Sequence, residues 1–134
     1  MTTFLTTNEI QQVNASFVGP DMMRDFGLLD SAVARPQASA FGDDAFPSIH
    51  EKAAALLHGL ARNHPFVDGN KRTAWAATSM FYMLNGYGIE AHDQGDIVAL
   101  VVDVAEGQLG VQDVAAKLKD WAQTFPVRDN WMDD

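Results

Sequence analysis

Apolar residues recur every three or four positions along most of this chain, a spacing that places them on one face of a helix. The segment 49–63 is the clearest case, because its apolar residues keep this period and Ser48 and Glu51 at its start have the spacing of a capping box. The same period predicts five further helices, so we expect an all-α fold. Their expected ranges are 6–17, 26–34, 70–85, 93–107 and 111–126.

Three further segments bear on the shape of the bundle. The segment 70–85 is apolar on most of its faces, which predicts a place at the centre, and glycine at position 86 suits a left-handed cap. The stretch 36–47 lacks helical periodicity and mixes glycine and aspartate with aromatic residues. We interpret it as a mobile loop or a short β-hairpin, with a plain connection as the alternative. The acidic tail 126–134 is expected to be loosely held.

Composition narrows the class of protein. The chain has 134 residues, 47% of them hydrophobic, which fits a single domain over 1–134 with its own core. The absence of cysteine excludes disulfides and thiolate zinc sites. No bilayer-spanning stretch and no basic start of a secretory signal are seen, so we expect a cytoplasmic protein. A net charge of −9 disfavours nucleic acid and anionic membranes as partners.

One segment stands out from this acidic background. In the run 64–72, His-Pro-Phe-Val-Asp-Gly-Asn-Lys-Arg, a base, an acid, a glycine, an amide and two cations occupy nine positions. The helix expected over 70–85 follows at once. The start of a helix offers free backbone N–H groups and the positive end of the helix dipole to an anion. The arrangement predicts a site for phosphate chemistry.

Two side chains of this run are candidates for catalysis. His64 lies outside the periodic segments, and an imidazole titrates near neutral pH, so it is a candidate general base. Asp68 is a candidate Mg²⁺ ligand, because that ion binds one or two carboxylates together with substrate phosphates. A structural histidine and an N-cap or Asx-turn aspartate are the alternative interpretations. Phe66 is assigned to packing, as the anchor of the loop.

The last four residues of the run suit an anion. Gly69 lets the backbone approach a phosphate closely, and Asn70 can cap the helix and offer an amide donor. Lys71 and Arg72 place two cations at the positive end of a helix, which costs stability unless an anion binds there. Neither a Walker-type nor a Rossmann glycine pattern occurs in the chain.

The run 64–72 resembles the signature of the Fic/Doc superfamily, His-x-Phe-x-Asp/Glu-Gly-Asn-Gly/Lys-Arg, at every defining position. The match is specific, because seven of the nine positions are chemically prescribed. The resemblance to the Doc, or death-on-curing, toxins of this superfamily covers most of the chain and is weak before residue 20 and after residue 125. Further segments that carry it are 28–36, 52–63, 84–88 and 107–118.

The resemblance implies an all-helical bundle in which the loop binds ATP with Mg²⁺ and a β-hairpin flap over the site aligns the target segment. The flap would lie within 36–47. It also implies that His64 activates the target hydroxyl and that Asp68 holds Mg²⁺. The implied phosphate ligands are Gly69, Asn70, Lys71 and Arg72.

One position separates the branches of the superfamily. AMP-transferring Fic enzymes usually carry glycine where this chain has Lys71, and a second arginine where it has Trp75. Doc toxins share the lysine. The resemblance to them implies a protein kinase that transfers the γ-phosphate of ATP to a threonine of elongation factor Tu and stops translation. A Fic-like nucleotidyltransferase is the alternative. A silent nucleotide-binding module is a third, against which the intact His64 and Asp68 argue.

The resemblance further implies a toxin–antitoxin system with a Phd-like antitoxin. Self-inhibited Fic proteins carry the pattern Ser/Thr-x-x-x-Glu-Gly/Asn, and no glutamate of this chain follows serine or threonine at that spacing. Inhibition is therefore expected in trans, from a disordered segment of another chain that folds as a helix on docking.

Overall fold

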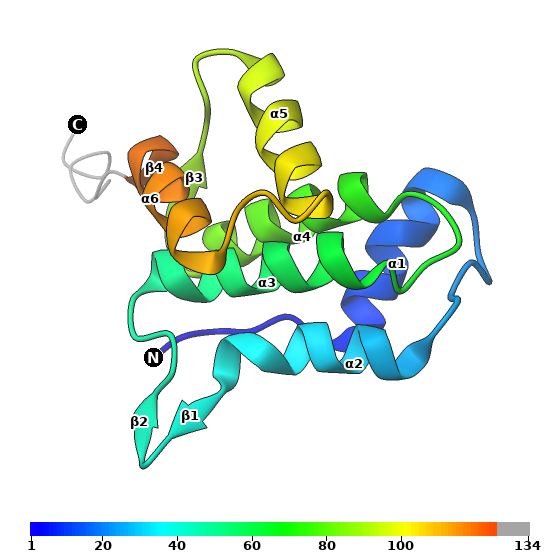
Figure 1. Cartoon of the computed structure of the whole chain (residues 1–134), viewed down its shortest axis with the longest axis horizontal. Coiled ribbons are helices and arrows are strands. Elements are labelled where there is room, and N and C mark those ends of the chain that lie inside the picture. Colours follow the sequence, from blue (N-terminus) through cyan, green and yellow to red (C-terminus); the bar gives the residue numbers. More distant parts are fainter. Residues whose placement is uncertain (126–134) are drawn as a thin grey trace, which may run out of the picture.

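The computed structural model describes residues 1–125, and the expected all-α class with a short hairpin is confirmed (Figure 1). No helix in this range is long and apolar enough to cross a membrane. The helical elements are α1 (Thr7–Val18), α2 (Phe26–Ala34), the 3₁₀-turn η1 (Arg35–Gln37), α3 (Ile49–Asn63), α4 (Asn70–Leu84), α5 (Gln94–Ala105) and α6 (Val111–Trp121).

Local sequence signals set several helix boundaries. The expected capping box is present, with Ser48 accepting from the backbone N–H of Glu51, and α1 begins with another, in which Thr6 accepts from the backbone N–H of Glu9. Each glutamate in turn accepts the N–H of its cap residue. Gly86 follows the end of α4 with a φ of 87°, as expected of a left-handed cap.

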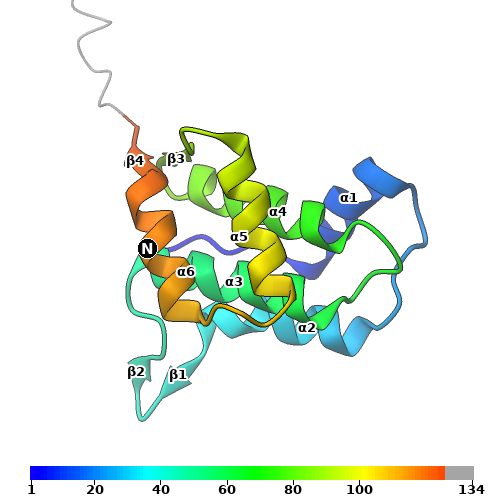
Figure 2. The ribbon, with the colours of Figure 1, turned by 45° about the horizontal axis from the view of Figure 1, so that its top comes forward.

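Helix α3 is the central element, lying between α2 and the pair α4 and α6 (Figures 1 and 2). Its small residues let the helices approach closely, since a Cβ added at Gly59 would stand 3.0 Å from the Cβ of Ala32. The prediction that 70–85 occupies the centre is wrong. Helix α4 buries one face and leaves Met80, Met83 and Leu84 exposed, because an apolar side chain can lie on a surface as well as in a core.

The irregular stretch 36–47 forms a hairpin in which β1 (Ser39–Ala40) pairs antiparallel with β2 (Asp43–Asp44). The hairpin stands at the N-terminal end of α3, whereas the loop 64–69 leaves the C-terminal end (Figure 1). At about 1.5 Å per residue, the 15 residues of α3 separate the two by about 22 Å. The hairpin itself was expected, but its position over the loop was not confirmed, because α3 acts as a rigid spacer.

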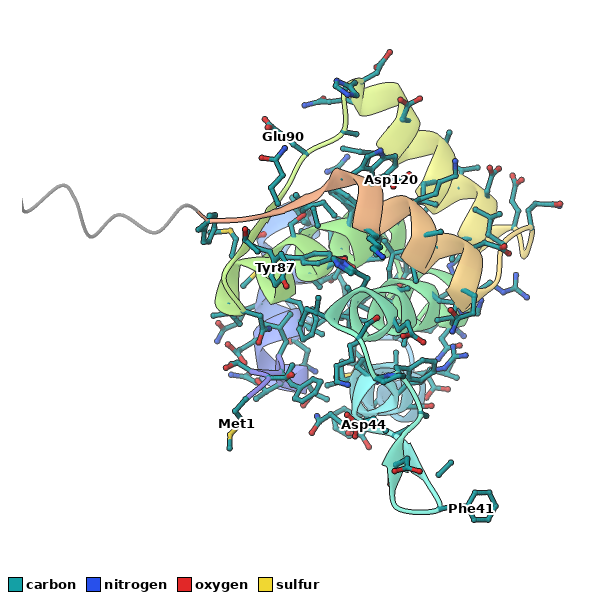
Figure 3. All side chains as sticks on the ribbon, turned by 90° about the vertical axis from the view of Figure 1, so that its left-hand side faces the viewer. Met1, Phe41, Asp44, Tyr87, Glu90 and Asp120 are labelled. Carbon is teal, nitrogen blue, oxygen red and sulfur yellow. The ribbon has the colours of Figure 1, made fainter. Side chains whose placement is uncertain are left out.

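A buried lysine ties the base of the hairpin to α3. Lys52 Nζ donates to the Asp44 carboxylate at 3.0 Å and to the carbonyl of Phe46. The Arg35 guanidinium lies 5.7 Å from the ring centroid of Phe46 and covers the same corner. Figure 3 shows Asp44 at this base and Phe41 pointing away at the tip. The hairpin is therefore held at its base and free at its tip.

Phe41 is a poor residue for the position it occupies. The two-residue turn Phe41-Gly42 has φ values of 53° and 86°, both positive as a type I′ turn requires. Asparagine adopts this conformation more readily than phenylalanine, and the Phe41 side chain is fully exposed, so its removal loses no packing. We expect Phe41→Asn to raise the free energy of unfolding by up to about 1 kcal/mol in denaturant titrations. A loss of stability would contradict the view that the Phe41 side chain contributes no packing at this turn.

A second small sheet was not predicted from the sequence. Strand β3 (Tyr87–Ile89) pairs antiparallel with β4 (Ala122–Thr124). Helix α6 therefore ends at Trp121, and the expected range 111–126 is too long, because the backbone at residue 122 is already extended. Strands of three residues show no alternation of their own. The expected tail 126–134 lies outside the described residues.

Candidate functional site

The loop that carries the signature leaves α3 at His64, whose backbone is left-handed and whose side chain is exposed. Arg24 holds this turn. Its Nε and Nη2 donate to the His64 carbonyl at 2.9 and 2.6 Å, and Nη2 also donates to the Asn63 carbonyl at 3.1 Å. Both carbonyls lie at the negative end of α3, where a cation is favoured. The candidate base is thus fixed by its backbone while its imidazole stays open to solvent.

The segment 22–25 continues along the same loop. Arg24 donates its backbone N–H to the carbonyl of Pro65 at 2.8 Å, and Val67 donates to the carbonyl of Met22 at 2.7 Å. Sequence reasoning assigned no role to this segment. A signal was present, since Arg24 is the only lysine or arginine in the first 34 residues.

Phe66 anchors the loop in the core, as expected, and is 3% exposed. Asn70 closes the loop on itself: its Oδ1 accepts the Phe66 N–H at 2.9 Å, and its Nδ2 donates to the Phe66 carbonyl at 2.8 Å. The expectation that Asn70 caps the helix is wrong, because Gly69 is the N-cap of α4. The amide oxygen and one hydrogen of the NH₂ group are used inside the loop, so its second hydrogen and the backbone N–H of Asn70 are left for an anion.

Asp68 lies exposed at the tip of the loop, where its Oδ1 accepts the N–H of Gly69 at 2.8 Å. This contact with the next residue is neither the N-cap nor the Asx-turn weighed for Asp68, because Gly69 is the N-cap of α4 and an Asx-turn bonds the backbone two residues on. It leaves room for a metal ion, since a carboxylate has about four lone-pair sites. Gly69 has a φ of 76°, and a Cβ there would stand 3.1 Å from Val18 Cγ1 and 3.2 Å from Asn14 Nδ2. Close approach of α1 therefore requires glycine at this position.

A cleft of about 630 Å³ opens beside the loop and has one charged and one apolar wall. The charged wall is formed by 68–72, including the exposed side chains of Lys71 and Arg72. The Arg72 guanidinium lies 5.4 Å from the ring centroid of Phe17, which covers one of its faces. The volume and the pairing of cations with an apolar wall suit a nucleotide-sized ligand. The apolar wall includes Phe17, Val18, Trp75, Ile97, Val98 and Val101.

The structure thus brings five of the six candidate residues, 68–72, onto one wall. His64 does not line the cleft and stands exposed at the start of the loop. The contributions of α1 and α5 were missed by sequence reasoning. Their residues keep helical period, and periodicity does not distinguish a side chain in the core from one that lines a cleft.

The helix histidines, given no functional role from the sequence, have structural partners. His58 Nδ1 lies 3.0 Å from Arg35 Nη1, and burial, followed by that guanidinium, lowers the pKa of His58. His50 Nδ1 lies 2.9 Å from the Tyr82 hydroxyl, and burial, followed by Lys119, lowers the pKa of His50. Among residues 1–125, no group of three or more His, Cys, Asp or Glu side chains is placed to hold a metal ion.

Comparison with known proteins gives concordant matches. The model of the Fic/DOC family matches residues 4–82, a range that contains α1, the hairpin and the whole loop. "Toxin Doc" of Mycolicibacterium smegmatis is 45% identical over 124 residues, which are 91% of this chain and 95% of that protein. "Protein kinase doc" of Escherichia phage P1 is 32% identical over 97 residues, 72% of this chain and 75% of that protein.

Proposed function

Because the chain belongs to the Fic/DOC family, we propose that it is the toxin of a type II toxin–antitoxin system and acts as a protein kinase. It transfers the γ-phosphate of ATP to a threonine of elongation factor Tu and so stops translation. The observation that carries this assignment is Lys71, exposed with Asp68 and Arg72 on one wall of the cleft. The printed names of the two relatives, a toxin and a protein kinase, support it.

His64 is the general base in this proposal. Its imidazole takes the proton of the threonine hydroxyl as the oxygen attacks the γ-phosphorus. The bond between the γ-phosphorus and the β–γ bridging oxygen breaks, and ADP leaves. The Arg24 bonds to the His64 carbonyl support this role, because they fix the residue that carries the base without using its ring.

The start of α4 binds the phosphates. The backbone at Gly69 and Asn70 lies at the positive end of the helix dipole. Lys71 adds a point charge, and Arg72 can grip two oxygens at once. Both side chains are exposed on the cleft wall, so neither must leave a buried partner to reach an anion.

Asp68 fits Mg²⁺, which keeps several waters and needs few protein ligands. The carboxylate is exposed and uses one oxygen for the Gly69 N–H, at 2.8 Å. Bound there with the nucleotide, Mg²⁺ would neutralise charge on the phosphates.

Replacing Asp68 should separate binding from folding. We expect Asp68→Ala to weaken Mg²⁺-dependent ATP binding at least about tenfold, or about 1.4 kcal/mol, in calorimetric titrations. The free energy of unfolding should change by less than about 0.5 kcal/mol, because the Asp68 side chain is exposed. Asp120→Ala, an exposed aspartate on α6, is the control. An unchanged Mg²⁺ dependence in Asp68→Ala would remove this residue from the metal site.

A Phd-like antitoxin would inhibit the enzyme in trans. The chain lacks the glutamate pattern of self-inhibited relatives. It also leaves Met80 and Met83 of α4 and Val98 of α5 exposed, which suits the apolar face of a helix that folds on docking. An internal deletion that activated an otherwise silent chain would contradict inhibition from outside.

The toxin and kinase assignments are tested together on the proposed target. Purified elongation factor Tu is incubated with the chain, ATP and Mg²⁺, and its phosphorylated residue is mapped by mass spectrometry. We expect one modified threonine and, on expression in bacteria, growth arrest with the same modification. Arrest without this modification would leave a toxin with another target. If the chain caused no growth arrest and left elongation factor Tu unmodified, both assignments would be contradicted.

A further inference from the structure

Helix α1 places a buried amide directly behind the loop. Asn14 is 2% exposed, and its Nδ2 donates to the Asp68 carbonyl at 2.9 Å and to Thr73 Oγ1 at 3.1 Å. Thr73 is itself fully buried and donates its backbone N–H to the carbonyl of Gly69 at 2.8 Å. The two hydrogens of one NH₂ group thus join the tip of the loop to the first turn of α4.

The bond to the Asp68 carbonyl acts on the carboxylate through one rigid unit. The carbonyl of Asp68 and the N–H of Gly69 belong to the same planar peptide group. In a trans peptide group the carbonyl and the N–H point in opposite directions. By fixing the direction of the Asp68 carbonyl, Asn14 therefore also fixes the direction of the Gly69 N–H. That N–H donates to Asp68 Oδ1 at 2.8 Å. A contact on the buried side of the loop therefore orients a carboxylate on its exposed side.

The neighbours of Asn14 on α1 support the same face of the site. Phe17 and Val18 are three and four residues further along, so they lie beside Asn14 on one face of the helix. The ring centroid of Phe17 lies 5.4 Å from the Arg72 guanidinium. A Cβ added at Gly69 would stand 3.1 Å from Val18 Cγ1. The helix thus presents a continuous face to the loop.

We propose that Asn14 is a positioning residue, which holds the Asp68–Gly69 peptide so that the Asp68 carboxylate is kept in place for Mg²⁺ and the bound phosphates. The consequence of this inference for catalysis rests on the proposed function. The predicted effect of Asn14 on the order of the loop does not depend on the proposed function. Removing a buried amide also costs stability, because the groups it served lose their partner. The test must therefore separate order in the loop from the stability of the whole chain.

The variant is Asn14→Ala, and Thr78→Ala is its matched control. Thr78 is also fully buried, and its hydroxyl donates to the Ala74 carbonyl within α4, away from the loop. Both variants remove one buried polar side chain. Only Asn14→Ala removes the bond to the Asp68 peptide. Asn14→Asp is a second variant, which keeps the shape but replaces the donor by a negative acceptor facing the Asp68 carbonyl.

The first readout needs no nucleotide. In the free protein, the NMR order parameter of the Gly69 N–H should fall from about 0.85 to below about 0.6 in Asn14→Ala and Asn14→Asp. It should stay unchanged in Thr78→Ala. If Gly69 remains ordered in folded Asn14→Ala, or loosens equally in Thr78→Ala, Asn14 does not position the loop.

The second readout is the Mg²⁺ concentration that half-saturates ATP binding. We expect a rise of about tenfold or more in Asn14→Ala, as for loss of a group that orients a metal ligand, and none in Thr78→Ala. A loosened Gly69 with unchanged Mg²⁺ dependence would overturn the consequence for the metal. A wild-type chain that bound no ATP would overturn the proposed function, while the order parameters would still decide the role of Asn14.

Discussion

Replacing His64 by alanine is expected to reduce phosphoryl transfer by about 10² to 10⁴-fold, the usual contribution of a general base, and to abolish growth arrest. The fold should survive. The imidazole is exposed, and the contacts that hold this turn, from Arg24 to the His64 and Asn63 carbonyls, involve the backbone and not the ring.

The left-handed backbone of His64 calls for a second variant. Alanine adopts a φ of 49° less readily than asparagine, so His64→Asn tests the loss of the base with less strain. His92→Ala, which removes another exposed histidine, is the control. Rates of phosphate transfer and denaturant unfolding are measured on all three. A folded His64→Asn protein that transferred phosphate at the wild-type rate would show that this histidine is not the base.

Lys71→Gly is expected to lower γ-phosphate transfer by about 10² to 10³-fold, the loss seen when one preorganised charge-stabilising group is removed. Lysine places bulk and a positive charge at the start of α4, where AMP-transferring relatives have glycine. It should exclude one orientation of the nucleotide and favour the reverse. AMP transfer should gain little, because Trp75 occupies the position of their second arginine.

Lys71→Met separates the two properties of the lysine, since it removes the charge and keeps the bulk. Orientation by bulk predicts that Lys71→Met remains a weak kinase without AMP transfer. Stability should change little in either variant. Removing a cation from the positive end of a helix raises the free energy of unfolding by about 0.3–1 kcal/mol. In Lys71→Gly this gain offsets the cost of placing glycine in a helix. Undiminished γ-phosphate transfer by Lys71→Gly would show that Lys71 does not orient the nucleotide.

The features that could be predicted from the sequence are those that depend on residues close together along the chain. The capping box of Ser48 and Glu51 and the apolar period behind it give α3 to within a residue. The run 64–72 predicts the loop, and its one aromatic anchor, Phe66, is buried as expected. Each of these signals acts within a few positions of the chain.

The parts that were missed depend on residues far apart in sequence. Asn14 reaches the Asp68 carbonyl across 54 positions, and Arg24 reaches that of His64 across 40. Nothing in the local pattern marks Asn14, and the isolation of Arg24 as the one cation of the first 34 residues does not indicate which carbonyl it contacts. The same holds for the pairing of β3 with β4 and for the central place of α3, which depends on what each helix packs against.

The nature of the transferred group tests the central claim most directly. The wild-type chain is incubated with Mg²⁺ and elongation factor Tu in two parallel reactions, one with ATP labelled at the γ-phosphate and one with ATP labelled at the α-phosphate. A kinase that uses His64 and Lys71 as proposed moves the γ-label onto the protein and releases ADP, while the α-label stays in solution. Transfer of the α-label to the protein, with release of pyrophosphate, would contradict it.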